Sequence, residues 1–303
     1  MMVLSSPVIF AQDADTFELE RLNFFPRSKS FFYSMYEHQS QDIDASRTSA
    51  STRSKSLQTN INVLSASYAY NVHKKAFVGL ALTYEEASDN GLKYGLSNPK
   101  KFHSRGFREP EIFSIIRLRE QRDDKGLIDL YLSYSDTLGS REIGNNSANR
   151  LNGKNIYNAT LSHGLYENEW EFKTSLQFKY YDEGEESNGF NKMTYDLGSY
   201  TDSIFKFQAQ YQLDFWCYVN AGIGFTYRGI QKVNDRQGDK REIQGGTGSL
   251  FELGFKFPVI KTMLAQINYQ IYRDDYFVKS STNTNFDGKE NNQNISINIV
   301  QGY

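Results

Sequence analysis

The residues best suited to covalent chemistry in this chain of 303 residues are His38 and Ser40. An imidazole that takes the proton of a serine hydroxyl turns that serine into a nucleophile. Residues two positions apart on a β-strand point to the same face, so the two side chains can meet if this segment is a strand. The sequence places no asparagine to orient the imidazole, and a histidine near a serine also occurs by chance at the edge of a Ser-rich loop. Catalysis is therefore one of two interpretations of this pair.

The other residues of reactive type predict neither a metal site nor a cofactor. No two of the four histidines have the spacing of zinc ligands. The single cysteine, Cys217, excludes a disulfide within the chain and a cysteine-based metal cluster. The carboxylate pairs Asp123–Asp124 and Asp274–Asp275 could suggest a protease, but turn chemistry explains both positions. We expect no metal and no cofactor.

The segment 169–181 shows which kind of element must position such residues. Its even positions, Trp170 to Tyr180, are mainly aromatic or aliphatic, whereas its odd positions up to Lys179 are polar or charged. Because a strand sends successive side chains to opposite faces, the segment has one apolar and one charged face. Such a strand packs on a second sheet in a soluble sandwich, or faces lipid in a membrane barrel with a polar interior.

The rest of the chain favours the barrel, because similar segments alternate with connections of two lengths. Short and long connections follow one another without exception, as periplasmic turns and extracellular loops do in transmembrane barrels. About twelve strands are predicted, an even number that puts both termini on the periplasmic side. The predicted strands are about 28–41, 56–70, 76–88, 108–120, 127–140, 154–166, 169–183, 200–213, 215–230, 247–257, 262–277 and 292–303. The long connections between them are 42–55, 89–107, 141–153, 184–199, 231–246 and 278–291.

One predicted strand, 56–70, changes parity along its length. Ile61 and Val63 occupy one face, whereas Leu64 and the apolar residues that follow it occupy the other. A β-bulge inserts one extra residue and would restore a continuous apolar face. We therefore predict a bulge near Val63 and Leu64.

Composition supports a strand-built membrane protein and excludes other classes. The chain contains 21 Tyr and 22 Phe, which suits the aromatic girdles of outer-membrane barrels. Mean hydropathy is −0.62, and no run approaches the roughly 18 apolar residues of a spanning helix. The net charge of −2 gives no electrostatic reason to bind nucleic acid, so we expect no such partner.

Charged residues recur on the polar faces of the predicted strands and would line the interior of a barrel. One interpretation is an electrostatic filter for a polar solute. The other is a set of salt bridges that fills the lumen. The candidates are Arg117, Arg119, Asp129, Glu171, Lys173, Lys179, Lys206, Glu252 and Lys256.

The two ends of the chain predict export and assembly. Residues 1–11 have the short apolar stretch of a signal-peptide remnant, 12–27 are expected to form a periplasmic extension, and 28–303 the barrel. The last predicted strand carries an apolar series on one face and closes on Tyr303. This ending resembles the C-terminal assembly signal of bacterial outer-membrane barrels, which implies the barrel-assembly machinery as a partner. The series consists of Ile295, Ile297, Ile299 and Tyr303.

The strand pattern over 28–303 resembles bacterial outer-membrane β-barrels of the porin-like class. The resemblance implies a single-domain, all-β, antiparallel transmembrane barrel in the outer membrane of a Gram-negative bacterium, in contact with its lipid. The main functional hypothesis is a channel for passive transport of a small polar or amphipathic solute, which requires an open, charged lumen.

Two alternatives to the channel stay open. His38 and Ser40 resemble the His-x-Ser of outer-membrane phospholipases, in which the histidine activates the serine and an asparagine orients the histidine. The surrounding residues of that motif are absent here. A lipid-modifying hydrolase of this kind needs a histidine within hydrogen-bond reach of its nucleophile. The other alternative is a structural or adhesive barrel that acts through its extracellular loops.

Overall fold

The structure is a computed structural model, and almost all of it is β-strand. It describes residues 29–47, 54–91, 100–121, 126–143, 149–188, 193–214, 217–235, 240–260, 263–280 and 286–303. Within these residues the strands are β1 (Ser30–Arg47), β2 (Ser54–His73), β3 (Ala76–Gly91), β4 (Lys100–Phe107), β5 (Glu111–Arg119), β6 (Leu127–Ser135), β7 (Arg141–Ile143), β8 (Lys154–Glu167), β9 (Trp170–Asn188), β10 (Met193–Leu197), β11 (Tyr200–Asp214), β12 (Cys217–Arg228), β13 (Gln231–Asp235), β14 (Lys240–Gln244), β15 (Thr247–Ile260), β16 (Met263–Ser280) and β17 (Phe286–Gly302). The predicted signal-peptide remnant 1–11 and extension 12–27 lie outside the described residues.

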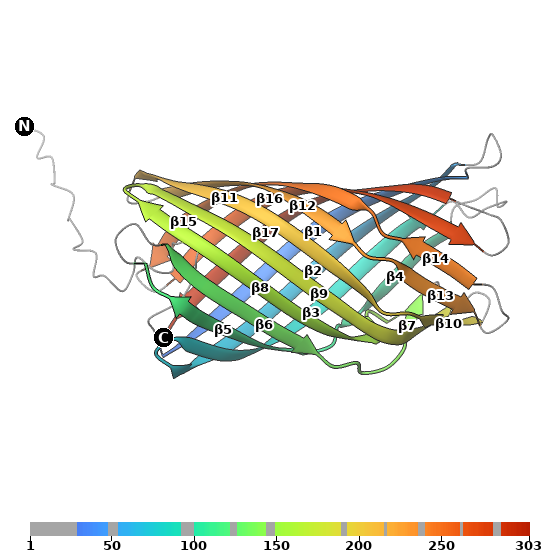
Figure 1. The fold of residues 1–303 in the computed structure, drawn as a ribbon, viewed down its shortest axis with the longest axis horizontal. Helices are drawn as coiled ribbons and strands as arrows, with labels where there is room; N and C mark the ends of the chain where they lie inside the picture. The colour runs from blue at the N-terminus through green and yellow to red at the C-terminus, as the bar shows by residue number, and fades with distance from the viewer. Residues whose placement is uncertain are drawn as a thin grey trace, which may run out of the picture.

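Twelve of these strands form one closed antiparallel barrel, which confirms the predicted fold class. The barrel closes because β1 pairs with β17 along its whole length, from Phe31 opposite Gly302 to Arg47 opposite Phe286. The two ends of the wall also meet, since the backbone N–H of Lys29 donates to the carbonyl oxygen of Tyr303 at 3.0 Å. In order around the wall the strands are β1, β2, β3, β5, β6, β8, β9, β11, β12, β15, β16 and β17 (Figure 1).

The extracellular end is more regular than the sequence predicts. β9 continues to Asn188 and β17 begins at Phe286, inside connections that were expected to be irregular. The short strands β4, β7, β10, β13 and β14 extend the wall at the end opposite the C-terminus (Figure 1). The apolar alternation ends at the membrane boundary, because both faces of a strand meet water beyond it, whereas backbone pairing continues.

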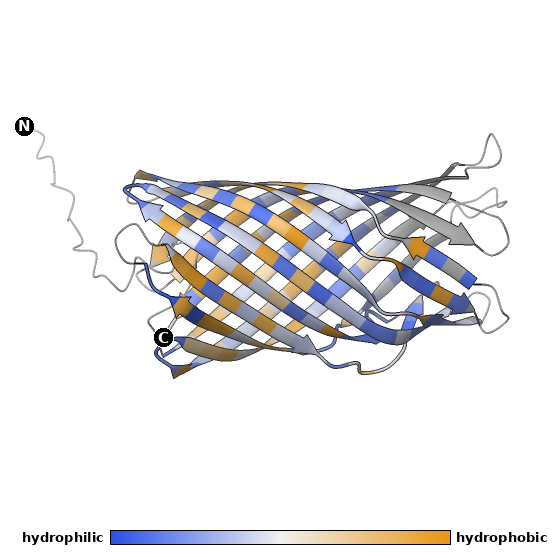
Figure 2. Cartoon of the chain, in the orientation of Figure 1, coloured by the Kyte–Doolittle hydropathy of each residue, from blue (hydrophilic) through white to orange (hydrophobic). Residues whose placement is uncertain are grey.

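The wall has an apolar outer face and a polar inner face, as the alternation on β9 illustrates. Leu176, Phe178 and Tyr180 are exposed, whereas Glu171 between Trp170 and Phe172 is buried. Figure 2 shows hydrophobic and hydrophilic residues alternating along the strands. No helix in the described residues is long and apolar enough to cross a membrane. The exposed apolar side chains form the outer band that contacts lipid.

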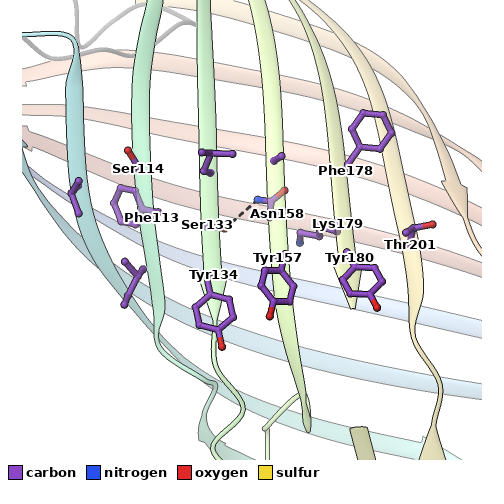
Figure 3. A pocket seen from close by; sticks show the side chains of 14 residues that line it. Phe113, Ser114, Ser133, Tyr134, Tyr157, Asn158, Phe178, Lys179, Tyr180 and Thr201 are labelled. Atoms are coloured by element: carbon purple, nitrogen blue, oxygen red, sulfur yellow. Dashed lines mark hydrogen bonds between the residues drawn. The ribbon is translucent and has the colours of Figure 1, made fainter. Parts of the chain in front are cut away.

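Aromatic residues mark both edges of this band. At the periplasmic edge the rings of Trp170 and Tyr211 lie 4.7 Å apart. At the extracellular edge Tyr134, Tyr157 and Tyr180 lie side by side on β6, β8 and β9, with ring centroids 5.0 Å and 6.0 Å apart (Figure 3). Trp170 and Tyr180 are separated by about 33 Å along β9. With a strand tilt of roughly 40° this corresponds to a band about 25 Å tall, which matches the apolar belt of an outer-membrane barrel.

The predicted bulge on β2 was wrong. β2 keeps an unbroken register with β1 and β3 through Val63 and Leu64. Val63 faces inward with 5% exposure, and Leu64 faces outward with 56% exposure. The apolar residues of the sequence switch from odd to even positions here because the outer face of β2 becomes polar at Asn62 and Asn60, at the extracellular edge of the band. Asn62 therefore points outward, directly opposite His38 of β1.

One sector of the interior is apolar. Phe31, Ala69, Phe77 and Phe113, from β1, β2, β3 and β5, form a buried cluster inside the barrel. Gly79 makes this packing possible, because a Cβ atom there would collide with the Phe113 ring and would lie 2.6 Å from the carbonyl oxygen of Tyr68.

Candidate functional site

The periplasmic half of the lumen contains a buried ion pair between neighbouring strands. Arg117 of β5 donates to Asp129 of β6 through Nε and through Nη2, the second contact being 3.2 Å long. The two side chains keep only about a tenth of their surface exposed, at 11% and 9%. Lys173 of β9 also attracts Asp129 electrostatically. These three residues therefore lie together on one region of the inner wall.

A second group lies on β9, β11 and β15. Lys206 Nζ is 2.5 Å from Glu252 Oε2. The side-chain amide of Gln208 donates to the other oxygen of Glu252 at 2.9 Å. Nearby, the amide of Gln210 donates to Glu171 at 3.1 Å. Lys206 and Glu252 thus neutralise each other.

The lumen is closed at this level by the described side chains. Exposure is 5% for Glu171, 2% for Gln210, 1% for Asn220 and 4% for Lys256. The apolar cluster on the opposite side is equally inaccessible to water. Exposures this low leave no room for a column of water beside these side chains. A permanently open, charged lumen, which the channel hypothesis requires, is therefore not found in the described part of the barrel.

Above this closed layer the lumen widens into a cavity of about 400 Å³. The pair Lys206–Glu252 forms the floor of the cavity. On β11, Lys206 is the next inward-facing residue after the lining residue Ile204 in the periplasmic direction, and on β15 Glu252 follows Leu250 in the same way. The cavity is lined by Gln39, Gln177, Lys179, Tyr181, Asp202, Ile204, Arg228, Leu250, Gln270, Tyr272, Glu290, Asn292 and Asn294.

Four charged side chains face this cavity, and they differ in how they are paired. Arg228 Nε donates to Asp202 at 3.3 Å. Glu290 accepts a hydrogen bond from the Gln41 amide at 2.6 Å. Lys179 makes no ion pair with any described residue. Lys179 is therefore the cation most available to a solute in the cavity.

Sequence reasoning missed a cluster of acidic residues near the extracellular end. Glu85 of β3 is buried, forms an ion pair with Arg108 at 2.5 Å and accepts a hydrogen bond from Arg150 at 2.8 Å. Glu109 accepts from the backbone N–H groups of Asn152 and Gly153. These contacts tie the segment before β8 to the wall. The long connection 141–153 gave no periodic signal that could have placed Arg150 beside Glu85.

Arg119 does not lie with the other inner charges. It follows a register shift between Arg117 and Arg119 at the periplasmic end of β5. Its side chain is exposed, and its Nε donates to the carbonyl oxygen of Gly126 at 2.7 Å. The shift breaks the alternation on which the prediction depended, so Arg119 caps a turn at the rim. The carboxylate pair at 274–275 also separates, since Asp274 is buried inside and Asp275 is exposed.

His38 and Ser40 lie on the outer face of β1, away from the lumen. His38 Nδ1 is 2.9 Å from the side-chain oxygen of Asn62 on β2. The same oxygen accepts a hydrogen bond from the Tyr36 hydroxyl at 3.2 Å. The asparagine that the sequence did not reveal is therefore present. Without the predicted bulge, the register of β1 and β2 would have placed Asn62 opposite His38.

The other histidines are exposed. His103 Nε2 lies 2.9 Å from Glu86 Oε1 at the extracellular edge of the wall. His73 and His163 lie toward the periplasmic end. No group of three or more His, Cys, Asp or Glu side chains that could hold a metal ion occurs among the residues described.

The outer wall also has a groove of about 520 Å³, shown in Figure 3. Most of the side chains that border it are apolar or aromatic and point outward, including Leu132, Tyr157 and Phe178. Behind them, the Asn158 amide donates to the Ser133 hydroxyl at 3.4 Å on the inner side of the wall. The groove lies within the apolar band.

Comparison with known proteins establishes the fold. No family model matches the chain, and no curated protein matches it. Among solved structures it is similar to an outer membrane channel from Pseudomonas putida F1, with a TM-score of 0.62 and 10% identity over 92% of this chain and 97% of that one. It is also similar to the transport unit of the autotransporter AIDA-I from Escherichia coli, with a TM-score of 0.57 and 10% identity over 96% and 95% of the two chains. The fold and the apolar outer band together make this chain a bacterial outer-membrane β-barrel, as the sequence predicted.

Proposed function

We propose that the barrel is a channel for passive transport of a small polar or amphipathic solute. The observation that carries this proposal is the cavity of about 400 Å³ inside the membrane-spanning wall, lined by amides, tyrosines and charges of both signs. Cavities of this size suit small molecules. The similar Pseudomonas putida structure is itself an outer membrane channel, which supports the same interpretation.

The closed layer beneath the cavity argues for a gated path. Passage to the periplasm requires the ion pair Lys206–Glu252 and the packed side chains below it to move apart. The charges in this layer are paired, and paired charges can separate and find new partners as water enters. We therefore infer that the channel conducts only when this layer opens transiently. While the layer is closed, solute binds in the cavity above it.

Replacing Lys179 with glutamate is expected to shift the ion selectivity of the openings toward cations. A unit charge about 4 Å from an ion contributes roughly 4 kcal/mol at an effective dielectric constant of about 20. Replacing Lys179 with glutamate therefore reverses the sign of a local electrostatic term of this size. The measurement is the reversal potential in planar bilayers under a KCl gradient, which should move toward the equilibrium potential of K⁺.

A matched control is Lys74→Glu, which makes the same change in an exposed residue of the β2–β3 turn. It should leave the reversal potential near the wild-type value. A folded Lys179→Glu barrel with an unaltered reversal potential would remove Lys179 from the path.

We also propose that the barrel-assembly machinery recognises the last strand, β17. The supporting feature is an outward apolar series on β17 that ends at the C-terminal aromatic residue, with all of its side chains exposed. The series consists of Ile295, Ile297, Ile299 and Tyr303.

A further inference from the structure

We propose that the outer face of the barrel carries a second, separate activity: hydrolysis of the ester-linked acyl chain of a membrane lipid. Ser40 is the nucleophile, His38 is the general base, and Asn62 is a positioning residue that orients the imidazole. This site lies outside the lumen and goes beyond the proposed channel.

The hydrogen bonds of Asn62 fix the state of the imidazole. The Asn62 side-chain oxygen accepts from the Tyr36 hydroxyl at 3.2 Å, and it lies 2.9 Å from His38 Nδ1. Because a carbonyl oxygen can only accept, His38 Nδ1 carries the proton. Nε2 at the tip of the ring is then the unprotonated nitrogen. No described residue forms a hydrogen bond with Nε2, so it is available as a base.

The backbone brings Ser40 within reach of this base. His38 and Ser40 are two residues apart on β1, so their Cα atoms are separated by about 6.6 Å and their side chains share the outer face. The imidazole keeps its hydrogen bond to Asn62, and the Ser40 hydroxyl turns toward Nε2, because catalytic hydrogen bonds often tighten only when substrate binds.

Amide groups flank Ser40 on both sides. Its register partners are Asn60 on β2 and Gln293 on β17. The Gln293 side-chain oxygen accepts from the Tyr269 hydroxyl at 3.5 Å, which leaves the Gln293 N–H₂ group to donate elsewhere. Amide N–H donors beside a nucleophile are the groups that stabilise the oxyanion of an acyl-transfer intermediate.

The position of the site along the membrane normal indicates that its substrate is a lipid ester. On the periplasmic side of His38 the outer face is apolar and exposed, with Tyr36, Leu64 and Ile297 lying side by side. On the extracellular side the outer face is polar, starting with Ser40 and Asn60. The boundary between hydrocarbon and head groups is where acyl esters of membrane lipids lie, so a carbonyl carbon meets the serine there.

The reaction balances without any added oxidant or reductant. The Ser40 oxygen forms a bond to the ester carbonyl carbon while its proton moves to His38 Nε2. The bond from carbon to the alcohol oxygen then breaks, and the departing alcohol takes that proton. Water, deprotonated by His38, attacks the acyl-serine, which releases a fatty acid and restores the Ser40 hydroxyl.

A neighbouring set of residues provides a matched control. Ser88 of β3 and His103 of β4 are register partners at the same edge, and Glu86 lies beside them. There the ring nitrogen at the tip of the imidazole, Nε2, is already engaged by Glu86 at 2.9 Å. Only Nδ1 remains, and it lies close to its own backbone. The geometry therefore points to Ser40 and not to Ser88.

The test uses the full chain folded into vesicles of an ester-linked glycerophospholipid, with parallel vesicles that contain lipid A and vesicles of an ether-linked analogue. Fatty acid should be released from ester-linked lipid but not from the ether analogue. His38→Ala should lower the rate by about 10²–10⁴. Ser40→Ala should abolish release, and Asn62→Ala should lower the rate while Asn62→Asp restores part of it. Release from the phospholipid or from lipid A identifies which of the two supplies the ester.

A second readout separates chemistry from structure. A fluorophosphonate probe should attach to Ser40 in the wild-type barrel, as mass spectrometry of the labelled peptide would show, and should not attach when His38 is alanine. Ser88→Ala and His103→Gln should leave both readouts unchanged. The proposal is overturned if the folded barrel releases no fatty acid from either lipid, or if loss of activity follows Ser88 in place of Ser40. Currents through the Ser40→Ala barrel should be normal. A failed hydrolase test would therefore leave the channel proposal unaffected.

Discussion

Replacing Asp129 with leucine is expected to destabilise the folded barrel by about 3–5 kcal/mol. Asp129 and Arg117 are both about nine-tenths buried and are joined by two hydrogen bonds. Removing the carboxylate leaves the guanidinium of Arg117 without a counter-charge in a site that water cannot reach. It also removes an electrostatic partner of Lys173. The measurement is the free energy of unfolding from urea titrations in a lipid refolding assay.

The double variant Arg117→Met, Asp129→Leu is the control. Replacing both partners of a buried ion pair by apolar residues of similar volume is often close to neutral, because no charge is left buried. The double variant should therefore recover most of the stability that the single change removes. Equal destabilisation by the single and double variants would mean that packing, and not charge pairing, makes this position sensitive.

Replacing Leu176 with arginine is expected to cost about 2–4 kcal/mol, because the side chain faces lipid near the midplane of the membrane. Leu176 lies between the aromatic edges of the band at Trp170 and Tyr180, and it is exposed on the outer wall. An arginine there must leave water for hydrocarbon, or bend along the wall toward a distant interface.

The adjacent residue gives a matched comparison. Gln177 points the other way and lines the lumen cavity, so Gln177→Arg keeps its charge in a polar space. The free energy of unfolding should change much less for Gln177→Arg than for Leu176→Arg. If both changes destabilise alike in the same lipid, the two faces of β9 have been assigned wrongly.

The wall of the barrel could be predicted from the sequence because its physical cause is local. A strand between lipid and lumen must alternate with period two, and that alternation is visible in segments such as 169–181. Predicting strands from this alternation failed outside the membrane, where a strand no longer lies between lipid and lumen. Beyond the apolar band both faces meet water, so the extracellular parts of β9 and β17 carried no signal. The bulge near Val63 was predicted for the same reason: the outer face of β2 becomes polar at Asn62.

The site depends on contacts between strands that are distant in sequence, and these could be predicted only in part. The inner position of Asp129 and Glu252 follows from parity alone. Their partners do not, because pairing across the lumen depends on the stagger of the closed barrel and on side-chain length. For this reason the sequence could not show that Lys206 is neutralised while Lys179 is not. It also could not show that the lumen is closed beneath its cavity.

The proposed channel and the proposed hydrolase use different surfaces of the same wall. Lys179 faces the lumen cavity, whereas His38 and Ser40 face the membrane. Because the inner and outer residues alternate along each strand, a substitution on one face leaves the other face in place. The two proposals can therefore fail or succeed separately.

Covalent block of the cavity during single-channel recording tests most directly whether solute passes through the lumen. In a Cys217→Ser background, Gln177→Cys places one thiol in the cavity, and Phe178→Cys places one on the adjacent, lipid-facing position. A bulky thiol reagent added on the extracellular side should cut the current of the Gln177→Cys barrel and leave that of Phe178→Cys unchanged. A current that persists after complete modification of Gln177→Cys, or a folded barrel that shows no openings at all, would contradict the channel.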